Sequence, residues 1–381
     1  SWEERQLLQK ETSALCRFLK PYMLVLWEES LACLETELGF SDYGRYCREK
    51  KGVDYAALKA EVAALLEATR DLYFDAMGAW CRERFQRPLA DLTRFDAIHL
   101  LGWGGFPVPY PTGIPLRETL SLADTWGLRL DDLPGLRVHT AANGEGAAQA
   151  MTILLRVPGE IHVLMAPSGG WIDLESLWHE LGHGLAGAFT PADLPVAQRE
   201  LATDHSLSEG YAFLLQGAVL SPSVLTGVLG LDASSANRLA YYKALRDLAV
   251  FRRYAAKLTW ELALFDGLDL SDGAPYAELM RQHTGFYHQP ESHLFDLTPE
   301  FYCCDYLRGM MTAHRLAEVL AASCGPDWPT SAATGDRLRD WWRAGHAAPV
   351  EAFCAARDIA PPSAEALVRH WERVLRAGPP P

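Results

Sequence analysis

The sequence contains no long apolar run, no closely spaced cysteine pair of the CxxC type and no run of basic residues. No stretch approaches the roughly 20 apolar residues that a membrane-spanning helix needs, which argues against an integral membrane protein. The eight cysteines form no tight framework, so we expect reduced, buried thiols in a cytoplasmic protein. The vicinal pair Cys303–Cys304 is expected to pack in a helix rather than to carry redox chemistry.

Positive charge is also scarce. The chain has 35 Lys and Arg residues against 49 Asp and Glu residues, which gives a formal net charge of −14. A nucleic-acid or membrane-surface partner needs a basic patch, so neither is expected. The first residues, SWEERQLLQKE, are acidic and helix-like, which is not typical of a secretory signal. Nothing in the sequence indicates an oligomeric state.

Most of the chain shows the periodicity of helices. Residues 1–38 carry apolar residues at helical spacing (Leu7, Leu8, Leu15, Phe18 and Leu19), with a break expected at Pro21. Residues 55–85 form a long amphipathic pattern. The segment LGWGGFPVPYPTGIP (residues 101–115) is dense in Gly and Pro, which predicts a loop, either a linker or a flap over a cleft.

Strand character is confined to one region. Residues 150–157 and 160–165 are rich in apolar and β-branched residues, and Pro158–Gly159 separates them, which predicts a hairpin. Helices resume at Asp173. We therefore expect a mainly α fold with a small hairpin or sheet. The N-terminal helical region is assigned to residues 1–135 and the catalytic region to residues 136–381, together forming one continuous folding unit.

The segment SLWHELGHGLAG (residues 176–187) contains an H-E-x-x-H motif directly after the hairpin. Asp173 is the expected N-cap of its helix. His179 and His183 then lie on one face, close enough for both imidazoles to bind one metal ion. Glu180 lies beside them, where its carboxylate can take a proton from water. The pattern predicts one zinc ion per chain.

Chance is a weaker explanation for this motif. Twelve histidines in 381 residues produce it by accident in roughly a few per cent of such chains. Gly182 and Gly184 each cost about 1 kcal/mol relative to alanine inside a helix. Their presence is understandable if another backbone approaches this helix closely.

A catalytic zinc site usually has a third protein ligand. Glu209 is favoured, because it lies in a helical segment 26 residues after His183. His205 is the rival ligand or a partner of one. Asp204 and Glu200 are alternative acceptors for a ligand imidazole, although a solvated position is the simpler interpretation of each.

A di-iron carboxylate site is the main alternative metal centre, because Glu180 and His183 form one E-x-x-H unit. Such a site needs a second unit, and the nearest pattern is Asp96-x-x-His99. This alternative is therefore disfavoured.

Two segments resemble the thimet oligopeptidase and oligoendopeptidase family of gluzincins. DLESLWHELGHGL (residues 173–185) is similar to the metal helix of that family, and FYCCDYLRGMMTA (residues 301–313) is similar to its substrate-binding stretch. The resemblance covers roughly residues 150–320. It implies a zincin-like metallopeptidase with two helical lobes around a cleft.

The resemblance also implies residue roles. His179, His183 and Glu209 would bind zinc, and Glu180 would be the general base. Tyr302 and Tyr306 would donate hydroxyls to the oxyanion. His293 would be the upstream catalytic histidine, with His288 as its competitor. The family often has further tyrosines where this chain has Met310 and Met311.

Together these features predict a zinc metallopeptidase that hydrolyses short peptides or peptide-like small molecules. The first alternative is a zinc-dependent hydrolase or tailoring enzyme that acts on one small amide or ester. The second is a non-catalytic binding protein that retains the fold.

Overall fold

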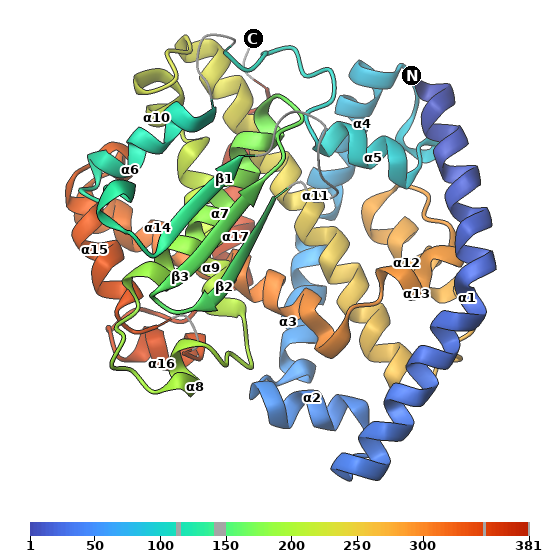
Figure 1. Ribbon diagram of the computed structural model, residues 1–381. Helices are drawn as coiled ribbons and strands as arrows, with labels where there is room; N and C mark the ends of the chain where they lie inside the picture. Colours follow the sequence, from blue (N-terminus) through green and yellow to red (C-terminus); the bar gives the residue numbers. More distant parts are fainter. Residues whose placement is uncertain (112–115, 141–149, 346–347, 380–381) are drawn as a thin grey trace. The chain divides into compact units, whose positions relative to one another are not determined.

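The computed structural model describes residues 1–111, 116–140, 150–345 and 348–379. It is mainly helical and contains a small three-stranded sheet beside the helix of the H-E-x-x-H motif, as predicted (Figure 1). Part of the predicted loop, residues 112–115, lies outside the described residues; residues 102–111, which are described, contain no helix or strand. In the described part of the chain, no helix is long and apolar enough to cross a membrane.

The chain forms two compact units. Unit 1 comprises Ser1–Gly105, Leu245–Leu307 and Trp371–Arg376, and unit 2 comprises Phe106–Ala244, Arg308–His370 and Ala377–Pro381. The division predicted from sequence, 1–135 and 136–381, uses contiguous segments, whereas the units are built from separate ones. Three helices contribute residues to both units: α11 (Ala233–Phe265), α14 (Tyr302–Cys324) and α17 (Ala364–Leu375).

Among its described residues, the regular elements of unit 1 are all helices. Besides its parts of α11, α14 and α17, its helices are α1 (Trp2–Leu38), α2 (Tyr43–Lys51), α3 (Tyr55–Ala68), α4 (Arg70–Phe85), α5 (Arg94–Leu101), α12 (Ala274–Thr284) and α13 (His293–Asp296). Trp27 of α1 packs in one core cluster with Trp260 of α11 and Tyr276 of α12.

The break expected at Pro21 is wrong, because α1 continues through this residue. A proline inside a helix removes one backbone hydrogen bond and costs about 3 kcal/mol. Burial of Cys16 before it and of Trp27 and Leu34 after it fixes both halves of the helix on unit 1 and offsets that cost.

Unit 2 contains the sheet. Its strands are β1 (Leu136–Thr140), β2 (Ala150–Arg156) and β3 (Glu160–Met165). Besides its parts of α11, α14 and α17, its helices are α6 (Ser121–Thr125), α7 (Trp171–Phe189), α8 (Val196–Arg199), α9 (Ser206–Val219), α10 (Pro222–Gly227), α15 (Ala333–Trp342) and α16 (Val350–Ala355). Together α7 and α9 carry the candidate site.

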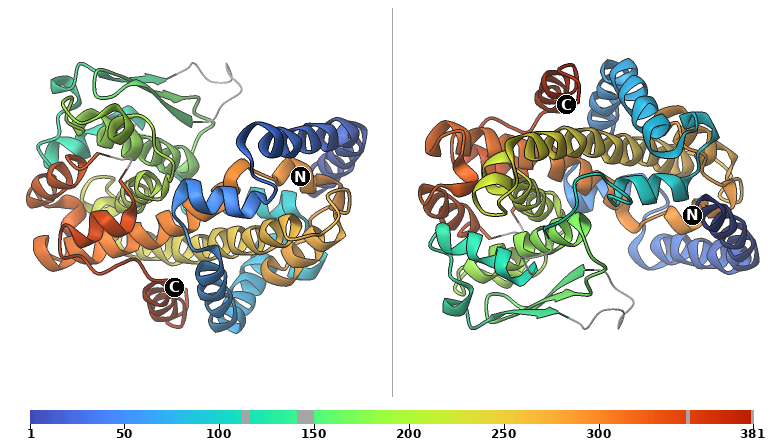
Figure 2. Two further views of the ribbon diagram at one scale, coloured as in Figure 1. Left: turned by 90° about the horizontal axis from the view of Figure 1, so that it is seen from below. Right: turned by 90° about the horizontal axis from the view of Figure 1, so that it is seen from above.

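The strand order in the sheet is β1-β3-β2. Strands β2 and β3 form the predicted antiparallel hairpin, with Ile153 opposite His162. Strand β1 was not predicted, and it pairs with β3 in parallel, with Val138 opposite Val163. The sheet covers one side of α7 (Figures 1 and 2).

Helix α7 begins at Trp171 with Gly170 as its N-cap, so the N-cap predicted at Asp173 is wrong. The Asp173 carboxylate instead accepts hydrogen bonds from the preceding loop, including the Ser168 amide at 3.1 Å and the Gly169 amide. A carboxylate in the first helical turn also interacts favourably with the helix dipole, so Asp173 fixes the start of the metal-site helix.

Glycines of α7 allow close packing on two sides, as predicted for Gly182 and Gly184. A Cβ on Gly184 would lie 3.0 Å from a methyl group of Val163 in β3. On the other side, a Cβ on Gly182 would lie 2.5 Å from Cα of Ala212 in α9. Only a glycine at position 182 lets the backbones of α7 and α9 approach this closely.

We predict that Gly182→Ala destabilises the protein by about 1–3 kcal/mol, because the added methyl group overpacks the contact with Ala212. Alanine favours a helix by about 1 kcal/mol over glycine, so the same substitution at a position with free space should raise the free energy of unfolding. Gly217 of α9 is the matched control, since a Cβ added there would meet no neighbouring group within 4 Å. Urea denaturation measures both variants; equal stability of the two would contradict the close approach.

Candidate metal centre

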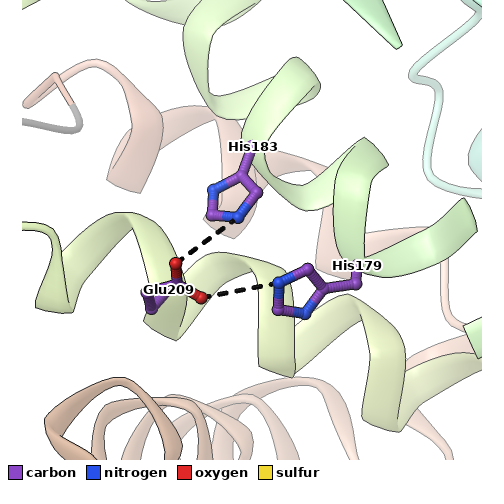
Figure 3. Close-up of side chains that lie close together, drawn as sticks. All are labelled: His179, His183 and Glu209. Atoms are coloured by element: carbon purple, nitrogen blue, oxygen red, sulfur yellow. Dashed lines mark ion pairs between the residues drawn. The ribbon is translucent and has the colours of Figure 1, made fainter. Parts of the chain in front are cut away.

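Three side chains from α7 and α9 point toward one another (Figure 3). His179 and His183 lie one turn apart on α7, and Glu209 lies in the first turns of α9. Nε2 of His179 is 3.5 Å from Oε2 of Glu209, and Nε2 of His183 is 3.9 Å from Oε1 of the same carboxylate. The side chain of Glu209 is buried, and the two imidazoles are mostly buried.

The spacing of these atoms fits a metal ion. One ligand atom from each residue lies within 4.8 Å of the others. Both nitrogen–oxygen distances exceed the 2.7–3.2 Å of a direct hydrogen bond. Ligands at about 2.0–2.1 Å from a tetrahedral zinc ion lie about 3.3 Å apart, and two imidazoles with one carboxylate are a donor set that zinc accepts. The residues present therefore fit zinc.

A chain of polar contacts orients His179. Its Nδ1 lies 3.0 Å from Oε1 of Gln216, and Nε2 of Gln216 lies 3.4 Å from Glu175. Lys243 is 3.9 Å from the same Glu175 oxygen. Since the Gln216 amide nitrogen is directed at a carboxylate, its oxygen accepts from His179, which leaves Nε2 of the neutral imidazole available as a ligand.

The second imidazole has an equivalent contact. Nδ1 of His183 lies 2.8 Å from the hydroxyl oxygen of Ser208, the residue before Glu209. With the proton on Nδ1 donated to Ser208, Nε2 of His183 also presents its lone pair. Helix α9 thus supplies the expected ligand Glu209 and also the side chains, Gln216 and Ser208, that contact the two histidines.

Burial and charge affect the imidazoles differently. Burial lowers the pKa of His179, but the nearby Glu209 carboxylate more than offsets it, so that the net pKa is raised. Burial dominates at His183 and lowers its pKa, against the opposing charge of Glu209. The neutral form that binds metal is therefore favoured at His183.

Glu180 lies between the two histidines on α7, and its side chain is partly exposed. Its backbone carbonyl accepts a hydrogen bond of 2.8 Å from the hydroxyl of Thr152 in β2. Its negative charge favours protonation of both His179 and His183, as expected for a nearby carboxylate. Strand β2 thus lies beside the residue predicted to be the general base.

Helix α14 supports the start of α9 within unit 2. Gly309 lies so close to Glu209 that an added Cβ would be 2.5 Å from the Glu209 Cβ. Arg308 contacts Asp204 at 2.6 Å, and Asp204 accepts a hydrogen bond of 2.9 Å from the Ser206 amide. Asp204 is buried, so the solvated position expected for it is wrong. Its carboxylate organises the first turn of α9 rather than accepting from a ligand imidazole.

Gln216→Leu is predicted to weaken zinc binding about 10–100-fold, because it removes the acceptor that orients His179. Gln198→Leu, at an exposed position of α8, is the matched control and should leave the affinity unchanged. Competition with a chromophoric chelator measures both dissociation constants. Equal affinity of the two variants would show that Gln216 does not orient the ligand.

The rival ligands lie elsewhere. Among the described residues, His179, His183 and Glu209 are the one group with metal-binding spacing, and His205 is not a member of it. Glu200 is bound to Arg199 and to the Val157 amide. The described residues also contain no second group of metal ligands of the kind that a di-iron site needs. Asp96, of the Asp96-x-x-His99 pattern, instead accepts hydrogen bonds from Thr93 as part of a helix cap.

Sequence reasoning missed Ser208 and Gln216. One signal was available for each residue. Gln216 follows the expected ligand Glu209 by seven residues, which places it on the same face of a helix, and Ser208 directly precedes Glu209. A metal-binding imidazole usually donates its other ring N–H to an acceptor, so polar residues beside a ligand are candidates for this contact.

The predicted tyrosines lie in unit 1, at the start of α14. The rings of Tyr302 and Tyr306 meet edge to face, with 5.2 Å between their centroids. Tyr306 also stacks on Tyr254 of α11 at 4.9 Å, and the Lys51 ammonium lies 5.7 Å from the Tyr302 ring. Their role toward a substrate stays a prediction. Met310 and Met311 are buried in unit 2.

The two candidate catalytic histidines are buried in unit 1. Nδ1 of His293 lies 2.8 Å from the Pro290 carbonyl, and Nε2 lies 3.0 Å from the Leu270 carbonyl. Both ring nitrogens are therefore engaged by the backbone. Burial lowers the pKa of His288 to about 3. The catalytic role of either residue stays a prediction.

The eight cysteines are all free, as expected, but the expected burial is wrong for Cys33, which is exposed, and Cys324 is only half-buried. Cys303 and Cys304 are buried, and the Cys303 thiol donates to Glu261 at 2.9 Å. Burial raises the pKa of Cys303 well above its usual value. A buried thiol of this kind is poorly reactive, in keeping with the predicted packing role.

No family model and no curated protein sequence matches this chain. Among solved structures, the chain is similar to metallocarboxypeptidase 1 of Trypanosoma cruzi, with a TM-score of 0.59 and 14% sequence identity. The similarity covers 98% of this chain and 80% of that chain. At this identity the likeness shows a metallopeptidase fold, and it does not single out the thimet oligopeptidase family.

Proposed function

We propose that this protein is a zinc-dependent peptidase acting on short peptides. The observation that carries the proposal is the convergence of His179, His183 and Glu209 at distances that suit one zinc ion. The adjacent Glu180, the contacts that orient both imidazoles and the metallopeptidase fold support it. The narrower assignment to the thimet oligopeptidase family rests on the two sequence motifs alone.

His179, His183 and Glu209 would hold the zinc ion. Bound zinc supplies Lewis acidity, which makes water more acidic and a carbonyl carbon more electrophilic. The Glu180 carboxylate accepts a proton from the attacking water. The water oxygen bonds to the carbonyl carbon, the C–N bond breaks, and Glu180 returns the proton to the leaving nitrogen.

Strand β2 supports an extended substrate. It forms an edge of the sheet as far as the described residues show, and its Thr152 contacts the Glu180 carbonyl. Peptides commonly bind to such an edge by backbone hydrogen bonds, which recognise any sequence. We propose that the substrate backbone pairs with β2 beside Glu180.

Tyr302 and Tyr306 are proposed to stabilise the oxyanion through their hydroxyl groups, as the resemblance implies. Their mutual packing and the stack on Tyr254 restrict the rings, which reduces the entropy lost on binding. His293 would first have to release one of the two backbone carbonyls that its ring contacts. The tyrosines are therefore the preferred donors.

The test is digestion of short N-acetylated peptides by the zinc-loaded chain, followed by mass spectrometry. Each peptide is supplied with a free and with an amidated C-terminus. Cleavage that requires zinc and Glu180 supports the proposal. Loss of the last residue from free C-termini alone would identify carboxypeptidase action. No cleavage by fully zinc-loaded protein would reject a peptidase and favour hydrolysis of a small amide or ester.

A further inference from the structure

Exposed apolar side chains are concentrated on one helix of unit 1. Of the 16 large hydrophobic residues that are exposed in the described chain, eight lie on α1. Seven of them form what we call the α1 stripe: Leu7, Leu8, Leu15, Phe18, Tyr22, Val25 and Leu26. The apolar spacing that predicted this helix therefore belongs largely to its solvent-exposed face.

The α1 stripe follows one face of the helix. Leu15, Phe18, Tyr22 and Val25 follow one another at intervals of three and four residues, and Leu8 lies two turns before Leu15, with the exposed Glu11 between them on the same face. The opposite face carries Cys16, Trp27 and Leu34, which are buried in unit 1. Each stripe residue is more than half exposed, and Phe18 reaches 69%. A surface of this kind is typical of an interaction site.

We infer that the α1 stripe binds the α1 stripe of a second copy of this chain, in an antiparallel arrangement around a two-fold axis between residues 16 and 17. The stripe runs from Leu7 to Leu26 and is centred at this point. Two antiparallel copies therefore place Leu7 opposite Leu26, Leu8 opposite Val25 and Leu15 opposite Phe18. An isologous interface of this kind is the commonest route to a dimer.

The area is sufficient for a dimer. Side chains of this size that are more than half exposed present roughly 100 Å² each, so the stripe offers roughly 700 Å² per copy, close to the roughly 800 Å² per partner of a stable interface. Only a partner with an equally long apolar face would cover it. The α1 stripe of a second copy has the same length.

Charge favours the antiparallel orientation. The C-terminal part of α1 carries Glu28, Glu29, Glu35 and Glu37 and no basic residue. Two antiparallel copies place these acidic C-terminal parts at opposite ends of the interface, whereas parallel copies would place each glutamate beside its equivalent. An acidic helix is also a poor ligand for a membrane surface.

Sedimentation velocity of the full zinc-loaded chain tests the inference. We expect a dimer at micromolar concentration for the wild type. Phe18→Glu places two like charges close to the axis and should weaken the dimer at least about 100-fold. Leu38→Glu, an equally exposed leucine of α1 outside the stripe, should leave it unchanged. Circular dichroism and zinc content confirm that the variants are folded.

A charge exchange tests the orientation. Leu8→Glu and Val25→Lys should each weaken the dimer several-fold, and the double variant should restore part of the loss, because antiparallel copies place these two positions opposite each other. A lack of restoration would overturn the antiparallel arrangement. A wild type that stays monomeric, or a dimer unaffected by Phe18→Glu, would overturn the interface. Binding of a monomeric wild type to phosphatidylserine vesicles, lost in Phe18→Glu, would also overturn it and assign the stripe to lipid.

Discussion

Replacement of Glu180 by glutamine is expected to lower kcat by about 10²–10⁴-fold while the zinc content stays at the wild-type level. The amide has the shape of the carboxylate but cannot take a proton from the attacking water. Glu180 is partly exposed and is not one of the three metal-binding side chains, so the variant should remain folded and loaded. Peptide hydrolysis and elemental analysis of the same sample measure both quantities.

Glu160→Gln is the matched control, because it removes the same charge from the partly exposed strand β3 of the same unit. Its kcat should equal that of the wild type. Near-wild-type turnover by Glu180→Gln would remove Glu180 from the mechanism. Loss of zinc from this variant would instead give Glu180 a role in binding the metal.

Glu209→Ala is expected to weaken zinc binding by about 10²–10³-fold. Zinc binding to structural sites with four ligands has a free energy of about 10–16 kcal/mol, so one ligand contributes about 3–4 kcal/mol. A loss of about 3–4 kcal/mol raises the dissociation constant by about 10²–10³-fold. The loss should exceed that of Gln216→Leu, since Gln216 acts through His179. Isothermal titration with zinc measures the effect.

His205→Ala serves as the control for the third ligand. His205 is the residue before α9 and does not belong to the group of His179, His183 and Glu209. Removal of its side chain should therefore leave the zinc affinity unchanged. A large loss in His205→Ala together with a small loss in Glu209→Ala would make His205 the third ligand and would reverse the assignment.

The sequence predicted the elements with strong local signals. Strands β2 and β3 begin and end within a residue or two of the expected positions, because Pro158–Gly159 separates two apolar runs. The metal helix and Glu209 followed from the spacing of a few residues that chemistry constrains. The role of Gly182 followed from the cost of glycine inside a helix, and the contact with Ala212 explains it.

Other features depend on contacts that a local pattern does not contain. Strand β1 has only five residues, LRVHT, and is stabilised by parallel pairing with the distant β3. Asp173 accepts hydrogen bonds from the preceding loop because the helix begins two residues before it. Only the backbone geometry shows where the helix begins. The two units were not predicted, because helices such as α11 contribute residues to both. The periodicity of a helix does not show which part of it belongs to which unit.

The central claim is that His179, His183 and Glu209 bind one zinc ion per chain. The most direct test is elemental analysis of purified protein after incubation with zinc and dialysis, compared with the His179→Ala/His183→Ala double variant. We predict one zinc per wild-type chain and almost none in the double variant, with both proteins folded by circular dichroism. A folded wild type without zinc, or a double variant that retains one zinc per chain, would contradict the claim.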